Sequence, residues 1–165
     1  MPADPARMFL QGLIEKLARQ YDAPVFKPHV TVHVGANHAD AAEKALSRAS
    51  RECQRINLKP RGVDHSDEFI KTLFMRFAPD KNLQRLNAIT RAAAQDPVRY
   101  QLSPHLSLLY KKIPAAARRA LADSIRVPFS EVTFDAFKAV RCVSPTKGCA
   151  DVEAWQVTAT KELPR

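Results

Sequence analysis

Cysteine is scarce in this chain, which has three cysteines among 165 residues. They are Cys53, Cys142 and Cys149, an odd number without a CxxC pair. A disulfide framework or a zinc site needs paired or clustered thiols, so the sequence favours neither. We expect all three to be buried free thiols, since a lasting bond between Cys142 and Cys149 does not suit a reducing compartment.

Long apolar runs are also missing, because Lys, Arg and Asp repeatedly interrupt the hydrophobic stretches. A membrane-spanning helix needs about 20 predominantly apolar residues, and none is predicted. The first residues, MPADPARMFLQG, lack the basic and apolar regions of a secretory signal. These absences favour a cytoplasmic protein without membrane contact.

Acidic residues are too few to balance the basic ones. The chain has 26 Lys and Arg against 17 Asp and Glu, a formal net charge of +9. This excess favours anionic partners such as phosphate esters or RNA. Arg48, Arg51 and Arg55 follow helical spacing, and a solvated helix face and a ligand contact are the two interpretations of that patch.

What is present fits one domain, since 45% hydrophobic and 26% charged residues are ordinary for a soluble fold of this length. Short connections between several strand pairs indicate an α+β fold with antiparallel pairing. Asp4 is expected to cap the first helix. Apolar periodicity predicts helices at 5–20, 39–53, 80–94 and 115–125, and strands at 25–34, 56–63, 69–77, 105–110, 131–143 and 154–162.

Two strand segments share one design. PHVTVHV and PHLSLLY each read proline, histidine, apolar residue, hydroxyl residue, apolar residue. Because side chains alternate along a strand, His29 shares a face with Thr31, and His105 shares one with Ser107. The valines of the first segment are expected to face the core, and His33 to share the face of His29. The repetition indicates two related lobes that give one imidazole and one hydroxyl each to a central cleft.

Such a set of side chains suits hydrolysis of a phosphodiester. A neutral histidine takes a proton from water, a protonated histidine donates one to the leaving oxygen, and hydroxyl groups hold the non-bridging oxygens. Histidine fits both roles near neutral pH, and the scheme needs no metal. The alternative is that both are ordinary core or surface histidines. Repetition of the whole Pro-His-x-hydroxyl pattern argues against coincidence.

With these motifs the sequence resembles the two-histidine (2H) phosphoesterases, whose mark is a pair of His-x-(Thr/Ser) motifs on strands of two pseudo-symmetric lobes. FKPHVTVHVG, SPHLSLLY and the WQVTATKEL ending are most similar to the cyclic nucleotide phosphodiesterase branch. The resemblance implies hydrolysis, without metal or cofactor, of 2′,3′-cyclic nucleotides to 2′-phosphates and of ADP-ribose 1″,2″-cyclic phosphate. It implies that His29 and His105 are the acid/base pair and that Thr31 and Ser107 hold the phosphate.

Further candidates for substrate contact are Tyr110, His33 and Trp155. The same branch keeps a tyrosine five residues after its second histidine, yet strand alternation places Tyr110 on the opposite face, so it reaches the cleft only where the strand ends or bulges. Trp155 is a candidate to stack a base. The alternatives are a core tyrosine, a core tryptophan and a hydrogen-bonded histidine at the cleft edge. Lys111 and Lys112 either border the cleft or form a charged strand exit.

One departure from the family concerns the N-terminus. Relatives begin with a strand and a proline-bearing turn before the first helix, whereas this chain begins with MPAD where that turn is expected. Either the true start of the chain is expected to lie upstream of this Met1, or the first sheet strand is expected to be absent from the domain at 1–165. Its absence would expose a sheet edge, which weakens the lobe or promotes dimerisation. Otherwise we expect a monomer.

Two other functions stay open. One keeps the site and changes the substrate, as in an RNA 2′,5′-phosphodiesterase or a ligase-like enzyme acting on RNA ends. The other is a binding module that holds cyclic or 2′-phosphorylated nucleotides without turnover. A small nucleotide needs a closed pocket, whereas an RNA end needs an open basic groove.

Overall fold

The structure is a computed structural model that describes residues 1–35, 39–94 and 100–165. Its helices are α1 (Ala6–Tyr21), α2 (Ala39–Glu52), α3 (Lys81–Ala94), α4 (Ala115–Ser124) and α5 (Cys149–Glu153), with a 3₁₀ turn η1 (Phe69–Lys71). Its strands are β1 (Ile56–Leu58), β2 (Pro60–His65), β3 (Leu73–Phe77), β4 (His105–Leu109), β5 (Val132–Phe134), β6 (Ala136–Arg141) and β7 (Gln156–Glu162). This is the α+β fold that the sequence predicts.

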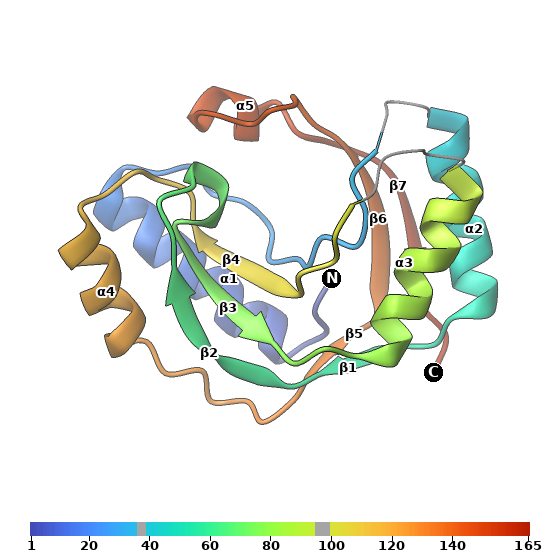
Figure 1. The fold of residues 1–165 in the computed structure, drawn as a ribbon, viewed down its shortest axis with the longest axis horizontal. Helices are drawn as coiled ribbons and strands as arrows, with labels where there is room; N and C mark the ends of the chain where they lie inside the picture. Colours follow the sequence, from blue (N-terminus) through green and yellow to red (C-terminus); the bar gives the residue numbers. More distant parts are fainter. Residues whose placement is uncertain (36–38, 95–99) are drawn as a thin grey trace.

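The described strands pair antiparallel in three small sheets, β2–β3–β4, β6–β7 and β1–β5. α1 packs on β4 and α4 packs on β2 and β3, which makes one half of the molecule. In the other half, α2 packs on α3 and on the β6–β7 hairpin. Figure 1 shows the two halves side by side, with β1 and β5 running along the lower side of both. These halves correspond to the two predicted lobes.

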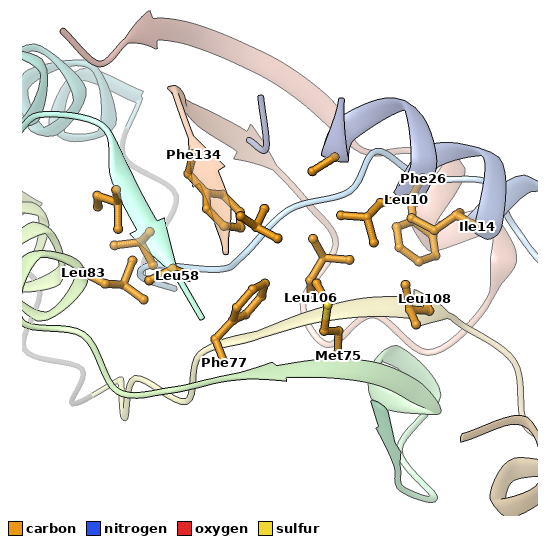
Figure 2. Close-up of a cluster of buried hydrophobic side chains, with 14 of the residues drawn as sticks. Leu10, Ile14, Phe26, Leu58, Met75, Phe77, Leu83, Leu106, Leu108 and Phe134 are labelled. Carbon is orange, nitrogen blue, oxygen red and sulfur yellow. The ribbon is translucent and has the colours of Figure 1, made fainter. Parts of the chain in front are cut away.

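A single hydrophobic cluster extends through both halves (Figure 2). Leu10 of α1 and Leu106 of β4 are fully buried in it. The ring of Phe77 in β3 meets that of Phe134 in β5 edge to face, with centroids 5.7 Å apart. Leu83 of α3 belongs to the same cluster. Because burial of one such side chain is worth about 1.5 to 3 kcal/mol, the shared core holds the two halves together.

The structure confirms the four predicted helices, each to within about one residue at either end. Asp4 was expected to cap α1, and this prediction is wrong: Asp4 pairs with Arg7, and Pro5 precedes the helix without a side-chain cap. The helix α5 was not predicted. Two of the expected strands are divided, 56–63 at Lys59 and 131–143 at Asp135, and the region 69–77 begins with η1.

The first three residues extend along β5. Pro2 forms an antiparallel bridge with Phe134, and the amide of Ala3 donates to the carbonyl of Thr133 at 2.8 Å. Residues 1–3 therefore continue the β1–β5 sheet, where a turn was expected. Of the cysteines, only Cys53 is buried, so the expectation of three buried thiols is wrong for Cys142, which is exposed, and for Cys149, which is partly exposed.

The segment 25–34 is not the regular strand that its alternation predicts. It makes one isolated bridge, between Val30 and Leu106, and the carbonyl of Val32 accepts a hydrogen bond from Asn87 Nδ2 of α3 at 2.6 Å. Val30 and Val32 pack into the core as expected, but Val34 is 46% exposed. The backbone of this segment thus accepts a hydrogen bond from a side chain of α3, where a regular strand would pair with a neighbouring strand. None of the helices in the described part of the chain is long and apolar enough to cross a membrane.

Candidate active site

A cavity of about 950 Å³ is lined by elements of both halves. From one half come β4 and the η1 turn, and from the other come α2, α3 and β6. The segment 25–34 borders it as well. A volume of this order is usual for small-molecule sites. His29, Thr31, His33, His105, Ser107, Tyr110 and Trp155, the predicted site residues, all border this cavity.

The two motif histidines make the same hydrogen bond. Nδ1 of His29 lies 2.7 Å from the carbonyl oxygen of Lys27, and Nδ1 of His105 lies 2.7 Å from that of Ser103. A carbonyl oxygen only accepts, so in both rings Nδ1 carries the hydrogen. Nε2 is then the nitrogen that can take up or release a proton on each imidazole. The resemblance between the two motifs therefore extends to individual atoms.

The proline before each histidine explains why these bonds are alike. Pro28 and Pro104 disfavour the helical region for the residue in front of them, which holds Lys27 and Ser103 extended. Their carbonyls are held beside the following histidine ring. The x-Pro-His sequence that both motifs share indicates this arrangement, although the hydrogen bond itself was not predicted.

Burial lowers the pKa of both imidazoles below the ordinary value of 6.5. The carbonyl of Lys27 opposes this shift of the His29 pKa, and positive charges on the N-terminus and on His105 add to it. For His105 the carbonyl of Ser103 and the carboxylate of Glu68 oppose the shift, and the ammonium of Lys71 adds to it. The two imidazoles are close enough for the charge of one to disfavour protonation of the other, so a state with one neutral and one protonated ring is favoured over double protonation.

The two motif hydroxyls differ in their surroundings. Ser107 is buried, and its Oγ donates to the carbonyl of Ile70 in η1 at 2.9 Å. Thr31 is half-buried at the cavity wall. Both lie two residues after their histidine and border the same cavity. To donate to a ligand, the Ser107 hydroxyl would rotate away from Ile70.

Tyr110 reaches the cavity because β4 ends at Leu109, so strand alternation no longer governs its direction. Its ring stacks on that of Phe26, with centroids 3.8 Å apart and planes 15° apart. Burial raises the pKa of its phenol, and a hydrogen bond with the Ser107 side chain opposes the rise. The strand end that the sequence analysis required for Tyr110 to reach the cleft is therefore present, and Tyr110 is both a packed residue and a wall of the cavity.

An aromatic wall continues from Tyr110 to Trp155. The Trp155 ring stands edge-on to His29 and to Tyr110, at 5.9 Å between centroids in each case. Its Nε1 is buried and has no hydrogen-bond partner within the described residues. His33 borders the same cavity, with its ring edge-on to Tyr100 at 6.2 Å.

Several residues around the site were not singled out from the sequence. Phe26 stacks on Tyr110, and Phe74 meets the His105 ring at 5.6 Å between centroids. Lys71 also borders the cavity. Phe74 and Lys71 come from elements other than the two motif segments, so no residue pattern marked them, whereas Phe26 lies three residues before His29 in the segment 25–34. Lys111, by contrast, bonds with its Nζ to the carbonyl of Asp22 at 2.6 Å outside the cavity lining.

Metal-ligating side chains do not cluster within the described residues: no group of three or more His, Cys, Asp or Glu is placed to hold an ion. The described residues that border the cavity include the two imidazoles, the two hydroxyls and several aromatic rings.

Solved structures with the same fold lead to the class of protein. E. coli LigT complexed with 3′-AMP is 17% identical, with a TM-score of 0.59 over 99% of this chain and 95% of that chain. TT0787 of Thermus thermophilus is 20% identical, with a TM-score of 0.59 over 98% and 93% of the two chains. A comparison with curated proteins gave no significant match. The fold is that of the 2H phosphoesterases.

Within that superfamily, the family model described as "Cyclic phosphodiesterase-like protein" matches residues 1–163. The chain therefore belongs to the cyclic phosphodiesterase-like family, as the resemblance of its two motifs suggested.

Proposed function

We propose that this protein hydrolyses cyclic phosphodiesters, in particular 2′,3′-cyclic nucleotides to 2′-phosphates or ADP-ribose 1″,2″-cyclic phosphate. The observation that carries the proposal is the matched pair of imidazoles, each bonded through Nδ1 to a backbone carbonyl and each bordering one cavity. Membership of the cyclic phosphodiesterase-like family supports the class of reaction.

In the proposed reaction, one of His29 and His105 acts through a neutral Nε2 as the general base. It takes a proton from water as the water oxygen bonds to phosphorus. The other imidazole is protonated at Nε2. It donates its own Nε2 proton to the ribose oxygen that leaves when the ring P–O bond breaks. Well-placed acid and base groups each contribute about 10² to 10⁴ in rate.

Thr31 and Ser107 hold the non-bridging phosphate oxygens by donating hydrogen bonds that strengthen as charge develops. Tyr110 keeps Ser107 in place through its phenol, and it borders the phosphate. Trp155 and His33 contact the nucleoside portion, Trp155 by offering its ring and its Nε1 hydrogen. The chemistry draws on no metal, because both proton transfers are assigned to side chains of the protein.

The nucleotide nature of the substrate is supported from two sides. The chain has a formal net charge of +9, which favours an anionic ligand. E. coli LigT, a protein of the same fold, has been crystallised with 3′-AMP and with ATP. An RNA end and a nucleotide bound without turnover are the competing possibilities.

One experiment separates these functions. Purified protein is incubated in EDTA with 2′,3′-cyclic AMP, ADP-ribose 1″,2″-cyclic phosphate and a 2′,5′-linked dinucleotide, and products are resolved by chromatography. We expect turnover of one or both cyclic phosphates. Turnover of the dinucleotide alone would favour an RNA-directed enzyme, binding without turnover would favour a binding module, and loss of activity in EDTA would contradict the metal-independent reaction.

A further inference from the structure

The two motifs supply no permanent positive charge, although the proposed substrate is an anion. Both imidazoles have lowered pKa values because they are buried, and the two hydroxyls are neutral. A cation from elsewhere is needed to balance the phosphate charge. Three lysines border the cavity within the described part of the chain, namely Lys27, Lys71 and Lys138.

Among these lysines, Lys71 lies beside the half of the site that contains His105 and Ser107. Its ammonium nitrogen is 4.8 Å from the centroid of the Phe74 ring, and that same ring meets His105 edge-on at 5.6 Å. Lys71 is the last residue of η1, the turn whose Ile70 carbonyl accepts the Ser107 hydroxyl at 2.9 Å. The turn thus connects Lys71 to Ser107 through the backbone of Ile70, and the Phe74 ring of β3 lies between Lys71 and His105.

The backbone around Lys71 is tied down on both sides. Its carbonyl accepts a hydrogen bond from Ser66 Oγ at 2.7 Å, and Thr72 Oγ1 donates to the carbonyls of Glu68 and Phe69 at 3.1 Å each. These bonds therefore fix the position of the Lys71 Cα. The flexible four-carbon side chain can still move its ammonium group to a ligand in the cavity. Within the described residues no carboxylate pairs with its ammonium, whose recorded contact is the aromatic face of Phe74.

We infer that Lys71 binds the phosphate of the substrate and of the product, and that its ammonium joins the Ser107 hydroxyl on the non-bridging oxygens. The inference rests on the proposed function for the identity of the ligand. A cation over an aromatic ring gains about 0.5 to 1 kcal/mol at exposed sites, less than a charge-assisted bond to phosphate, so the ammonium exchanges the ring for the ligand. Lys71 also selects for charge, because a phosphate monoester near neutral pH carries up to two negative charges and a cyclic diester carries one.

The test compares Lys71→Gln and Lys71→Arg with Lys112→Gln. Lys112 is an exposed lysine outside the cavity lining, so its replacement removes the same net charge without touching the site. Binding of 2′-AMP and of adenosine is measured by calorimetry, and kinetics with 2′,3′-cyclic AMP are measured in parallel. The 71 variants keep the backbone bond to Ser66, and melting temperatures check that they fold.

Lys71→Gln should weaken 2′-AMP binding by about 10-fold to 100-fold, raise KM for the cyclic substrate by a smaller factor, and leave adenosine binding unchanged. Lys71→Arg should keep most of the affinity for 2′-AMP. Equal Kd values for 2′-AMP in Lys71→Gln and Lys112→Gln would overturn the role of Lys71. Wild-type binding without turnover, lost in Lys71→Gln, would contradict the proposed hydrolysis but support this lysine, whereas a wild type that turns over 2′,3′-cyclic AMP without binding 2′-AMP would overturn the role of Lys71 and leave the hydrolysis intact.

Discussion

At the scale of single residues, the two histidines acquire their chemistry from their immediate neighbours. A backbone carbonyl fixes the tautomer of each ring, and burial disfavours the protonated form. The ring of His29 lies among Phe26 and Trp155, and that of His105 lies against Phe74. These apolar surroundings strengthen any electrostatic interaction inside the cavity.

The lowered pKa values predict an acidic shift of the pH profile. Because kcat/KM reports the free enzyme, its two limbs should follow the pKa values of His29 and His105, both below 6.5. One imidazole must be protonated for activity, so kcat/KM for 2′,3′-cyclic AMP should fall as the pH rises above the lowered pKa of that imidazole. Steady-state rates between pH 4.5 and 8.5, flanking the value of about 6.5 for an unperturbed histidine, test this. A basic limb near pH 8 would contradict it.

The sequence was a good guide to these residues and a poor guide to their partners. The spacing of His29 and Thr31, and of His105 and Ser107, needs only the strand period, which is a local property. Phe74 and Lys71 reach the site from other elements, and their placement depends on how the sheets and turns pack. For Tyr110 the alternation left two positions open, because the end of β4, which decides between them, is not visible in the alternation.

At the scale of elements, helices were predicted well because a core-facing helix has a strong apolar period. The segment 25–34 shows the limit of this reasoning. Its alternation predicts a strand, yet its main recorded partners are a single bridge to Leu106 and a side-chain bond from Asn87. Alternation reports which side chains are buried, but it does not report whether a neighbouring strand is present to pair with the backbone.

The bond from α3 to this segment is expected to hold His29 in position. In Asn87→Ala the carbonyl of Val32 loses its donor, which costs about 1 to 3 kcal/mol of stability where the group stays buried. Since a misplacement of about 1 Å can cost up to about 10²-fold in rate, kcat should fall as well. Asn82→Ala, at an exposed position of the same helix, is the control. Equal melting temperatures and equal kcat for the two variants would show that the bond is dispensable.

At the scale of the whole molecule, the chain alternates between the two halves. α1 belongs to one half, α2 to the other, β2 and β3 to the first, α3 to the second, and β4 to the first again. Neither half is a continuous piece of sequence, and one hydrophobic cluster serves both. We therefore propose that residues 1–165 form a single folding unit with two lobes.

This proposal predicts one cooperative unfolding transition. Leu106 of β4 is fully buried, and Leu106→Ala should cost about 2 to 5 kcal/mol. Trp155, the single tryptophan of the chain, adjoins β7 in the other half and reports there by fluorescence. The midpoint of urea unfolding should shift equally by Trp155 fluorescence and by far-ultraviolet circular dichroism. Val157→Ala, at a position 56% exposed, should shift neither midpoint appreciably. A fluorescence midpoint unaffected by Leu106→Ala would mean that the halves unfold separately.

The central claim is that one histidine from each lobe forms a single acid/base pair, and the kinetics of His29→Ala, His105→Ala and the double variant test it most directly. His65→Ala, a histidine of β2 outside the cavity lining, is the control. Each single variant should lower kcat for 2′,3′-cyclic AMP by about 10² to 10⁴. The double variant should be about as slow as the slower single variant, since groups that act as a unit are not additive. A His105→Ala protein with a near-normal rate, or losses that simply multiply in the double variant, would contradict the pairing.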